Sequence, residues 1–350
     1  MDSVTQAALG ALCGELVLRK KLGNWGIVWG LFFGTLPDLD VLASPWLDTA
    51  GKLAFHRGVS HSFLLMLVGG LIFGWLLKRL HRKSALTWWE GGWFVFLAWS
   101  THVLIDCFTV YGTQILAPFN DLRASLDNLF IIDLFFTVPI LVGLVAVMFM
   151  AREGRRRRLW GIAVVSWLLC YTAMSFGMQA WAKSEFERRL AADAIEVERI
   201  QVTATLSNIV LWRMVAETEE HYYVGYWTPW DGPKNRSWAK VEKRHDLIAD
   251  LQGGREFETV EWFSKGWFIA RPSKDGVTVA DMRFGEIRVQ EGEQTYLMPT
   301  FRWNLVGEGQ DARISDEGSG RPDVDMGPVL KGFWERLKGG APGYMDGEWR

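Results

Sequence analysis

This chain has few cysteines and almost no net charge, and each of these features excludes a class of protein. The 350 residues include three cysteines, Cys13, Cys107 and Cys170. All three lie in apolar segments and none belongs to a CxxC pair, which indicates small buried hydrophobic side chains and argues against disulfides and thiolate metal ligands. The net charge is −2, and no sustained basic face remains once the clusters that flank apolar segments are set aside. Nucleic-acid binding is therefore not expected.

Several common sequence signatures are also missing. The chain has no glycine-rich phosphate loop, no GxSxG nucleophile elbow and no HExxH zinc-protease helix. Its N-terminus, MDSVTQAALGALCGELVL, has no basic stretch before the apolar run, so we do not expect a signal peptide. A serine nucleophile stays open, because Ser60 and Ser62 flank His61.

Long apolar runs are concentrated in residues 1–183. The first two, about Val4 to Leu18 and Trp25 to Leu36, are short for a full membrane crossing. Four longer candidates follow at residues 62–77, 88–110, 130–150 and 159–182. Tryptophans at their ends are typical of membrane–water interfaces. We therefore predict an α-helical integral membrane domain of about six apolar segments in residues 1–183.

Three basic clusters predict the orientation of this domain. They are residues 19–21, 78–83 and 155–158, after the first, third and fifth apolar segments. The positive-inside rule assigns all three to the cytoplasmic side. The loops at 37–61 and 111–129 and the whole of residues 184–350 then face the extracytoplasmic side.

Residues 184–350 are predicted to form a soluble extracytoplasmic α+β domain. A charged helical stalk at 183–194 precedes alternating runs typical of strands, VERIQVTATL, IVLWRMVAET and HYYVGYW. Residues 238–251 and 258–268 are predicted to be helical, and two more strands follow, GVTVADMRFG and QTYLMPTFRWNLV. Residues 307–326 are predicted to form a loop, and the tail after Gly339 is predicted to be mobile.

Ionisable side chains gather in the loop between the second and third apolar segments, and two more follow on the fourth segment. Carboxylate and imidazole are the groups that bind zinc, manganese or iron, and ionisable groups at the edge of a bilayer core are costly unless they have a function. The predicted orientation places all of them on the outer side. These candidate metal ligands are Asp38, Asp40, His56, His61, His102 and Asp106.

Each part of this pattern has a second interpretation. His102 and Asp106 are four residues apart, so both can reach a metal, or they can hydrogen-bond to each other in a helix bundle without one. Asp38 and Asp40 follow a proline, and an extended segment there can place both on one side. One of the two would bind the metal while the other orients a ligand or a water, or one would cap a helix.

The residues around these ligands predict how a substrate is held. Arg57 suits a phosphate or carboxylate group, although a lipid headgroup contact is the competing interpretation. Substrate binding is assigned to Arg57, Thr109, Tyr111 and Thr113, and catalytic roles to Asp40, Arg57 and Asp106. Asp127 and Asp133 would orient a ligand from outside, with a helix cap as the alternative for Asp133.

Four motifs in order carry a family resemblance: MDSVTQAALGA, GTLPDLDV, FHRGVSHSF and HVLIDCFTVYGTQILAPF. Over about residues 1–180 they resemble the bacterial inner-membrane, metal-dependent hydrolases described as LexA-regulated hydrolases. That family is grouped with zinc-dependent phospholipase C and the zinc single-strand nucleases, whose HxxxD element matches His102 and Asp106. The resemblance implies a hydrolase with a divalent metal, zinc first and manganese second.

The chain departs from that family at two places. Many members have a histidine where this chain has Gln6, and the histidine that follows HxxxD in the soluble enzymes is missing. The number of metal ions and the contribution of Gln6 therefore stay open.

We expect a membrane-bound, metal-dependent hydrolase at the outer face of the bacterial cytoplasmic membrane. A bound metal lowers the pKa of its water from about 15.7 to about 7, and this water would attack an ester or phosphoester of a lipid or lipid-linked substrate. The alternative is a non-catalytic membrane protein with a structural metal or a His/Asp cluster. Its outer domain would then bind envelope components through its many tryptophans, or these would form an aromatic core.

Overall fold

The structure is a computed structural model of the chain, and it divides into two compact units that are described in turn. It describes all residues except 233–237, 292–293, 318, 320–325, 341–345 and 350. The first compact unit, called here the helical unit, comprises residues 1–46, 55–176 and 206–208. The second, the sheet unit, comprises residues 47–54, 177–205 and 209–350.

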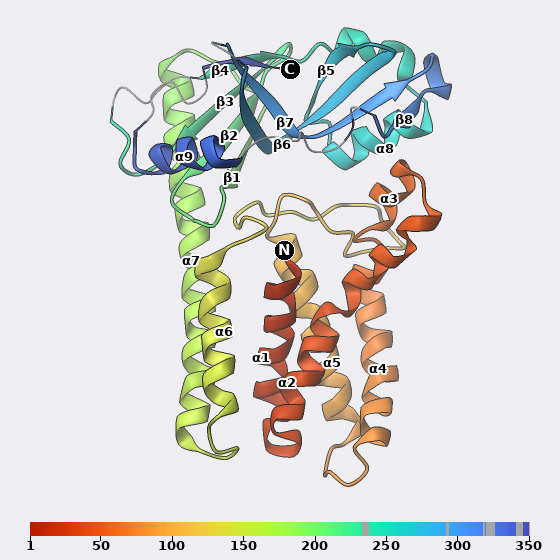
Figure 1. The fold of residues 1–350 in the computed structure, drawn as a ribbon, viewed down its shortest axis with the longest axis vertical. Helices are drawn as coiled ribbons and strands as arrows, with labels where there is room; N and C mark the ends of the chain where they lie inside the picture. The colour runs from red at the N-terminus through yellow and green to blue at the C-terminus, as the bar shows by residue number, and fades with distance from the viewer. Residues whose placement is uncertain (233–237, 292–293, 318, 320–325, 341–345, 350) are drawn as a thin grey trace. The chain divides into compact units, whose positions relative to one another are not determined.

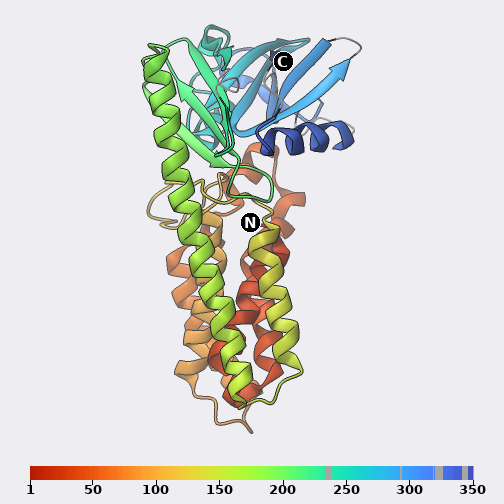
Figure 2. The same cartoon turned by 90° about the vertical axis from the view of Figure 1, so that its left-hand side faces the viewer.

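The helical unit is built from apolar helices (Figure 1). They are α1 (Ser3–Leu22), α2 (Asn24–Thr35), α4 (Phe63–Leu80), α5 (Trp88–Cys107), α6 (Leu134–Met148) and the first part of α7 (Arg155–Ala192). Two 3-10 segments of this unit lie between α2 and α4 in the chain, η1 (Leu36–Trp46) and η2 (Val59–His61). The short α3 (Thr49–Phe55) comes between them in sequence and belongs almost entirely to the sheet unit. Figures 1 and 2 both show α6 beside α7.

Glycines bring α1 and α2 into direct backbone contact. A Cβ added at Gly30 would lie 2.2 Å from the Gly10 carbonyl oxygen, and one at Gly14 would lie 1.9 Å from the Gly26 carbonyl oxygen. Small residues of this kind allow membrane helices to approach closely. The contact continues to Gly34, where an added Cβ would lie 2.6 Å from the carbonyl oxygen of Gln6. The end of α2 is therefore held against the start of α1.

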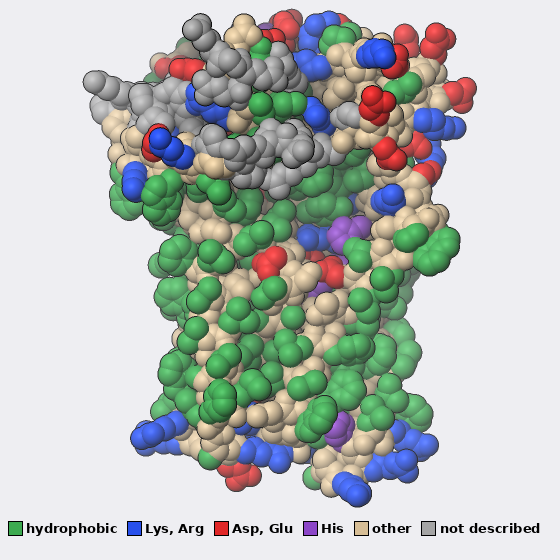
Figure 3. Space-filling view, viewed as in Figure 1, with side chains coloured by type: hydrophobic (Ala, Val, Ile, Leu, Met, Phe, Trp, Pro, Cys, Tyr) green, Lys and Arg blue, Asp and Glu red, His purple; other side chains and the backbone are tan. Residues whose placement is uncertain are grey.

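The helical unit has the surface of a membrane protein. Among the described residues, three stretches are long and apolar enough to span a membrane: Asn24–Trp46, Phe63–Leu80 and Arg155–Ala192. The apolar helix α6 is shorter. Figure 3 shows hydrophobic side chains covering the helices and basic side chains gathered at one end. Exposed apolar surface on this scale indicates contact with lipid. The exact number of crossings stays a prediction.

The connection from α5 to α6, residues 108–133, folds back over the end of α5. Leu126 donates its backbone N–H to the Cys107 carbonyl at 2.7 Å, and Leu129 donates to the Phe108 carbonyl at 3.1 Å. An isolated antiparallel bridge joins Thr113 to Ala124. These bonds fix the long connection next to the residues that end α5.

The sheet unit contains two antiparallel sheets. The first has the order β1-β2-β3-β4, with β1 Arg199–Ala204, β2 Trp212–Glu217, β3 His221–Trp227 and β4 Ala239–Glu242. The second has the order β5-β6-β7-β8, with β5 Phe268–Ser273, β6 Gly276–Glu291, β7 Gln294–Val306 and β8 Arg313–Ser315. The unit also contains the helices α8 (Arg255–Ser264) and α9 (Met326–Leu337). Antiparallel sheets with helices fit the predicted α+β class.

Two local predictions for this region are wrong. Residues 238–251 were expected to be helical, but the left-handed backbone of Arg244 (φ 55°) separates β4 from a 3-10 segment, His245–Leu251. Part of the predicted 307–326 loop pairs with β7 as strand β8. The mobility predicted for the tail after Gly339 stays a prediction. Within this tail, β9 (Glu348–Trp349) pairs in parallel with β7, and Trp349 packs on the apolar core. Residues 341–345 and 350 of that tail lie outside the described residues.

The tryptophans of the sheet unit mainly build its interior. Trp212, Trp227 and Trp267 have 0%, 4% and 6% of their surface exposed, while Trp230 is 59% exposed. The predicted stalk is helical and continuous with α7, which extends to Ala192. The boundary predicted at residue 183 therefore lies inside one helix.

Candidate metal centre

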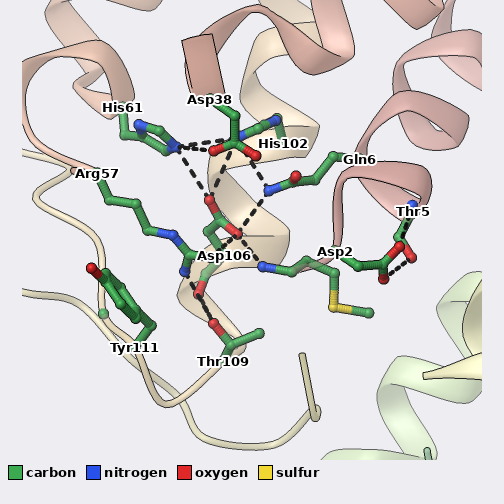
Figure 4. A network of polar contacts seen from close by, with 12 residues as sticks. Asp2, Thr5, Gln6, Asp38, Arg57, His61, His102, Asp106, Thr109 and Tyr111 are labelled. Atoms are coloured by element: carbon green, nitrogen blue, oxygen red, sulfur yellow. Dashed lines mark hydrogen bonds and ion pairs between the residues drawn. The ribbon is translucent and has the colours of Figure 1, made fainter. Parts of the chain in front are cut away.

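Four of the six predicted ligands converge on one point in the helical unit (Figure 4). Helix α5 presents His102 and Asp106 from the same face, one turn apart. Asp38 comes from η1 and His61 from η2. The side chains of His61, His102 and Asp106 are fully buried, and that of Asp38 is 17% exposed. The ligands therefore come from three segments that only the fold brings together.

The four facing atoms have the spacing of a tetrahedral metal site. The two histidine Nε2 atoms are 3.1 Å apart. Each lies 3.4 Å from Asp38 Oδ1, and they lie 3.3 and 3.5 Å from Asp106 Oδ2. Zinc bonds of about 2.0–2.1 Å in a regular tetrahedron separate neighbouring ligand atoms by about 3.3 Å. A tetrahedral ion therefore fits between these atoms.

The proton positions on both histidines favour a cation at this point. His102 Nδ1 lies 2.6 Å from the Gly34 carbonyl oxygen, an acceptor, so Nδ1 carries the proton and Nε2 a lone pair. His61 Nδ1 lies 2.9 Å from Ser60 Oγ, whose own proton goes to Asp40 Oδ2 at 2.8 Å. His61 Nδ1 therefore donates to Ser60, and its Nε2 also presents a lone pair.

Two carboxylate oxygens complete a set of four acceptor atoms, and the Gln6 amide Nε2 lies 3.2 Å from one of the four, His102 Nε2. Asp38 Oδ1 and Asp106 Oδ2 are buried and have no hydrogen-bond partner. Buried acceptors that face one another are unfavourable unless a positive charge lies between them. The residues therefore fit a bound cation.

The other two predicted ligands form an adjoining, more open group. His56 Nδ1 lies 2.9 Å from Asp40 Oδ1, and the His56 side chain is 28% exposed. Asp40 Oδ2 accepts the backbone N–H of Arg57 at 3.0 Å as well as the Ser60 hydroxyl. Asp38 belongs to both groups, since ligand atoms of Asp38, Asp40 and His56 also lie within 4.8 Å of one another.

The second oxygen of Asp106, Oδ1, is surrounded by donors. Arg57 Nη2 lies 3.1 Å from it, and Gln6 Nε2 donates to it at 2.9 Å. The Met1 amino group lies 2.5 Å from the same oxygen. These contacts hold the carboxylate so that Oδ2 points toward His61 and His102. Gln6 thus lies in the site at the position where many relatives of the resembled family have histidine.

Two guanidinium groups and a tyrosine lie beside this centre. The Arg57 and Arg123 guanidinium carbons lie 4.7 and 4.9 Å from the centre of the Tyr111 ring. Arg57 Nη1 donates to Thr109 Oγ1 at 3.2 Å, while Arg57 Nε is buried without a partner. Burial raises the pKa of Tyr111 despite the nearby cations Arg123 and Arg57, which keeps its hydroxyl neutral.

Three predicted residues have other surroundings. Thr113 is fully buried and bridges to Ala124 through its backbone. Asp133 caps α6 by accepting the Phe136 N–H, and it accepts a hydrogen bond from the Tyr171 hydroxyl at 2.8 Å. Of its two predicted roles, the structure therefore shows the helix cap. Asp127 lies in the 108–133 connection with a left-handed backbone (φ 59°), and the contacts described for His61 and His102 do not involve it.

Two functional groups could not be identified from the sequence. The Gly34 carbonyl has no side-chain signature, although the run of glycines at four-residue spacing in α2 marks the close contact that positions it. Arg123 is not part of a recognisable sequence motif. Its guanidinium donates to the carbonyl oxygens of Tyr111 and Gly112 at 2.9 and 3.2 Å. Its place beside Tyr111 depends on the folding of residues 108–133.

Comparison with known proteins places the helical region in a family. The chain is 25% identical over 233 residues to the uncharacterized protein YfhP of Bacillus subtilis (strain 168), covering 64% of this chain and 68% of that protein. It is 29% identical over 126 residues to the inner membrane protein YbcI of Escherichia coli (strain K12), covering 35% of this chain and 71% of that protein. No solved structure matches.

The name of YbcI and the description of the matching family support a location in the inner membrane, and neither states a catalytic activity. The matching family model is described as YdjM inner membrane protein and covers residues 1–182, which include the four converging ligands. Because the match extends over more than half of the chain, this protein belongs to the YdjM inner membrane protein family.

Proposed function

We propose that this protein is a metal-dependent hydrolase of the inner membrane, with its active site at Asp38, His61, His102 and Asp106. The observation that carries the proposal is the convergence of four buried acceptor atoms, 3.1 to 3.5 Å apart wherever a pair is described, of which the two carboxylate oxygens have no hydrogen-bond partner. Two imidazole nitrogens with two carboxylate oxygens suit zinc better than magnesium or calcium, which prefer oxygen ligands in larger shells. Manganese is the second choice.

The protein's own groups have separate roles around the cation. A divalent cation supplies a Lewis acid and lowers the pKa of a water molecule that it binds. Asp106 is fully buried and serves as a ligand, which leaves proton transfer to the partly exposed pair His56–Asp40. Asp40 orients His56 through the 2.9 Å contact with Nδ1, so that Nε2 is available for a proton.

Arg57 is positioned to stabilise negative charge on a substrate. Its guanidinium lies within 3.1 Å of Asp106 Oδ1 and has a buried Nε without a partner. A fixed cation beside the reacting centre stabilises charge that develops in the transition state. Arg123, on the same tyrosine ring, adds a second positive charge. This pair favours an anionic substrate, a phosphoester first.

The surroundings of the carboxylates favour a lipid or lipid-linked substrate. The segment η1 carries Asp38 and Asp40, and it also exposes apolar side chains, among them Leu42 (64%) and Trp46 (82%). A substrate with acyl chains can contact this apolar surface while its polar part reaches the ligands. We propose about six membrane segments, with the site and residues 184–350 on the extracytoplasmic side. The basic clusters at 19–21, 78–83 and 155–158 support this orientation.

A second candidate function follows from the same geometry. Four protein ligands fill a tetrahedral shell, which is typical of structural zinc, whereas catalytic zinc keeps a position open for water. In that case the metal stabilises the helical unit and the sheet unit performs the function. The partly exposed Asp38, shared with the Asp40–His56 group, favours the catalytic role, because it is the ligand that water can reach.

Metal content and hydrolysis, measured on the purified full-length protein, test the proposal. We expect about one zinc or manganese per chain in the wild type, loss of the metal in His102→Ala and in Asp106→Ala, and retention in the control His221→Ala, which lies in strand β3. We also expect hydrolysis of a phospholipid phosphoester that His56→Ala abolishes without loss of metal. Metal without any hydrolysis would favour the structural role. A wild type that binds no metal would refute both.

A further inference from the structure

A basic cavity lies in the helical unit where α1 ends and α7 begins. It has a volume of about 410 Å³ and is lined by Arg19, Lys20, Glu153, Gly154, Arg155 and Arg158. Its volume lies in the range of small-molecule binding sites. Gln6 of the metal centre lies thirteen residues before Arg19 on α1, which corresponds to about 20 Å of helix. The cavity is therefore separate from the metal centre.

The positive charge of this cavity is not neutralised by the protein. Four cationic side chains line it against one carboxylate, Glu153, and the ion pairs described for the helical unit include none of the five. The Nε atom of Arg19 is also buried without a hydrogen-bond partner. By contrast, the neighbouring Arg157 does not line the cavity, and its guanidinium donates two buried hydrogen bonds to the Glu15 carboxylate at 2.6 and 2.8 Å. The cavity thus carries an excess of positive charge.

The surroundings of the cavity define the kind of anion. The free N–H groups and the dipole at the start of α7, a helix of 38 residues, favour negative charge. Guanidinium groups match phosphate oxygens in pairs. Next to the cavity, Leu16, Leu159 and Trp160 expose 49%, 51% and 42% of their surface. Figure 3 shows basic side chains gathered at the end of the helices, next to the hydrophobic band.

We propose that this cavity binds the phosphate group of an anionic phospholipid. Arg19, Arg155 and Arg158 contact the phosphate oxygens, and the acyl chains lie along Leu16, Leu159 and Trp160. Helices α1 and α7 are adjacent at this level, since a Cβ at Gly161 would lie 3.4 Å from Leu16 Cδ2. The lipid therefore joins α7 to α1, and it does so whether or not the metal centre is catalytic.

The test is native mass spectrometry of the full-length protein in a neutral detergent, with added phosphatidylglycerol or phosphatidylcholine. We expect one retained phosphatidylglycerol, bound about tenfold more tightly than phosphatidylcholine. The variant Arg155→Gln/Arg158→Gln should weaken phosphatidylglycerol about tenfold or more, because it removes two charges near the lipid. Both side chains are exposed, so this variant should fold.

A matched control removes the same charge from outside the cavity. Arg156→Gln/Lys83→Gln changes two exposed cations that do not line it, and it should bind phosphatidylglycerol like the wild type. Displacement of the lipid by millimolar inorganic phosphate would identify the phosphate group alone as the ligand, and resistance would show that the acyl chains contribute. Equal binding of the two lipids, or equal weakening in both double variants, would overturn the proposal.

Discussion

The Nε2 atoms of His61 and His102 lie 3.1 Å apart, while the Nδ1 atom of each ring is bonded to another acceptor. Two neutral imidazoles held this way present lone pairs to each other, which is unfavourable without a cation between them. Their orientation depends on groups outside the cluster, the Ser60 hydroxyl and the Gly34 carbonyl. Such outer partners commonly change metal affinity when they are mutated.

Gly34→Ala should impair both the fold and the metal centre. The new Cβ would lie 2.6 Å from the Gln6 carbonyl oxygen and 3.0 Å from Gly10 Cα, so α2 has to move away from α1. We expect a loss of about 1–3 kcal/mol in the free energy of unfolding. Metal affinity should fall about 10- to 100-fold, because the Gly34 carbonyl shifts from His102.

Thermal unfolding in detergent and metal titration measure the two effects of Gly34→Ala. Gly177→Ala in α7 is the matched control, because no atom lies within 4 Å of its added Cβ. Equal behaviour of the two variants would contradict the role of the close α1–α2 contact.

Ser60→Ala should reduce metal affinity and Ser62→Ala should reduce stability, although the two serines are only two residues apart. Ser60 orients His61 through Nδ1, so its loss should reduce metal affinity about 10- to 100-fold with little change in stability. Ser62 caps α4 by accepting the Leu65 N–H, so its loss should cost about 1 kcal/mol of stability and leave metal affinity unchanged. Metal titration and thermal unfolding of both variants separate the two roles. A loss of metal affinity in Ser62→Ala alone would reverse the assignment.

Arg57→Gln should reduce hydrolysis far more than metal binding. Arg57 does not belong to the four ligands, but its guanidinium lies 3.1 Å from Asp106 Oδ1. Removal of a charge-stabilising group of this kind typically lowers kcat about 10²- to 10³-fold. Steady-state kinetics with zinc analysis of the same samples check this prediction. Loss of zinc in parallel with activity would instead indicate that Arg57 maintains the ligand geometry.

Acidification should weaken the sheet unit through His245. Burial disfavours the charged imidazole and lowers the pKa of His245 below 6.5, and a 2.9 Å contact with the Phe268 carbonyl only partly opposes this effect. The unfolded chain then binds more protons, so stability decreases as the pH falls below about 6.5. The protection factors of the β5 amides in hydrogen exchange, which correct for the slower intrinsic exchange at lower pH, should decrease between pH 7.5 and 5.5. His245→Gln should remove most of that pH dependence, and an unchanged profile would exclude His245 as its source.

Local sequence patterns were sufficient to identify many elements. The alternating runs at residues 221–227 and 294–306 coincide with β3 and β7, because a strand exposes successive side chains on opposite faces. The i,i+4 spacing of His102 and Asp106 placed both on one face of α5, because helical residues four apart lie above one another. By contrast, residues 238–251 contain no local signal strong enough to reveal β4, which forms because Val241 pairs with Tyr222 of β3.

The sequence by itself determined the apolar segments, the basic ends of the helices and the residue types able to bind a metal, since these depend on composition and short-range periodicity. Only the tertiary structure decided which of them meet. It selected Asp38, His61, His102 and Asp106 as the inner four and placed Asp40 and His56 beside them. It also supplied the Gly34 carbonyl, 68 residues from His102 in the chain. Contacts over such separations depend on how helices pack, and the glycine spacing in α2 marks a close helix contact without identifying its partner helix.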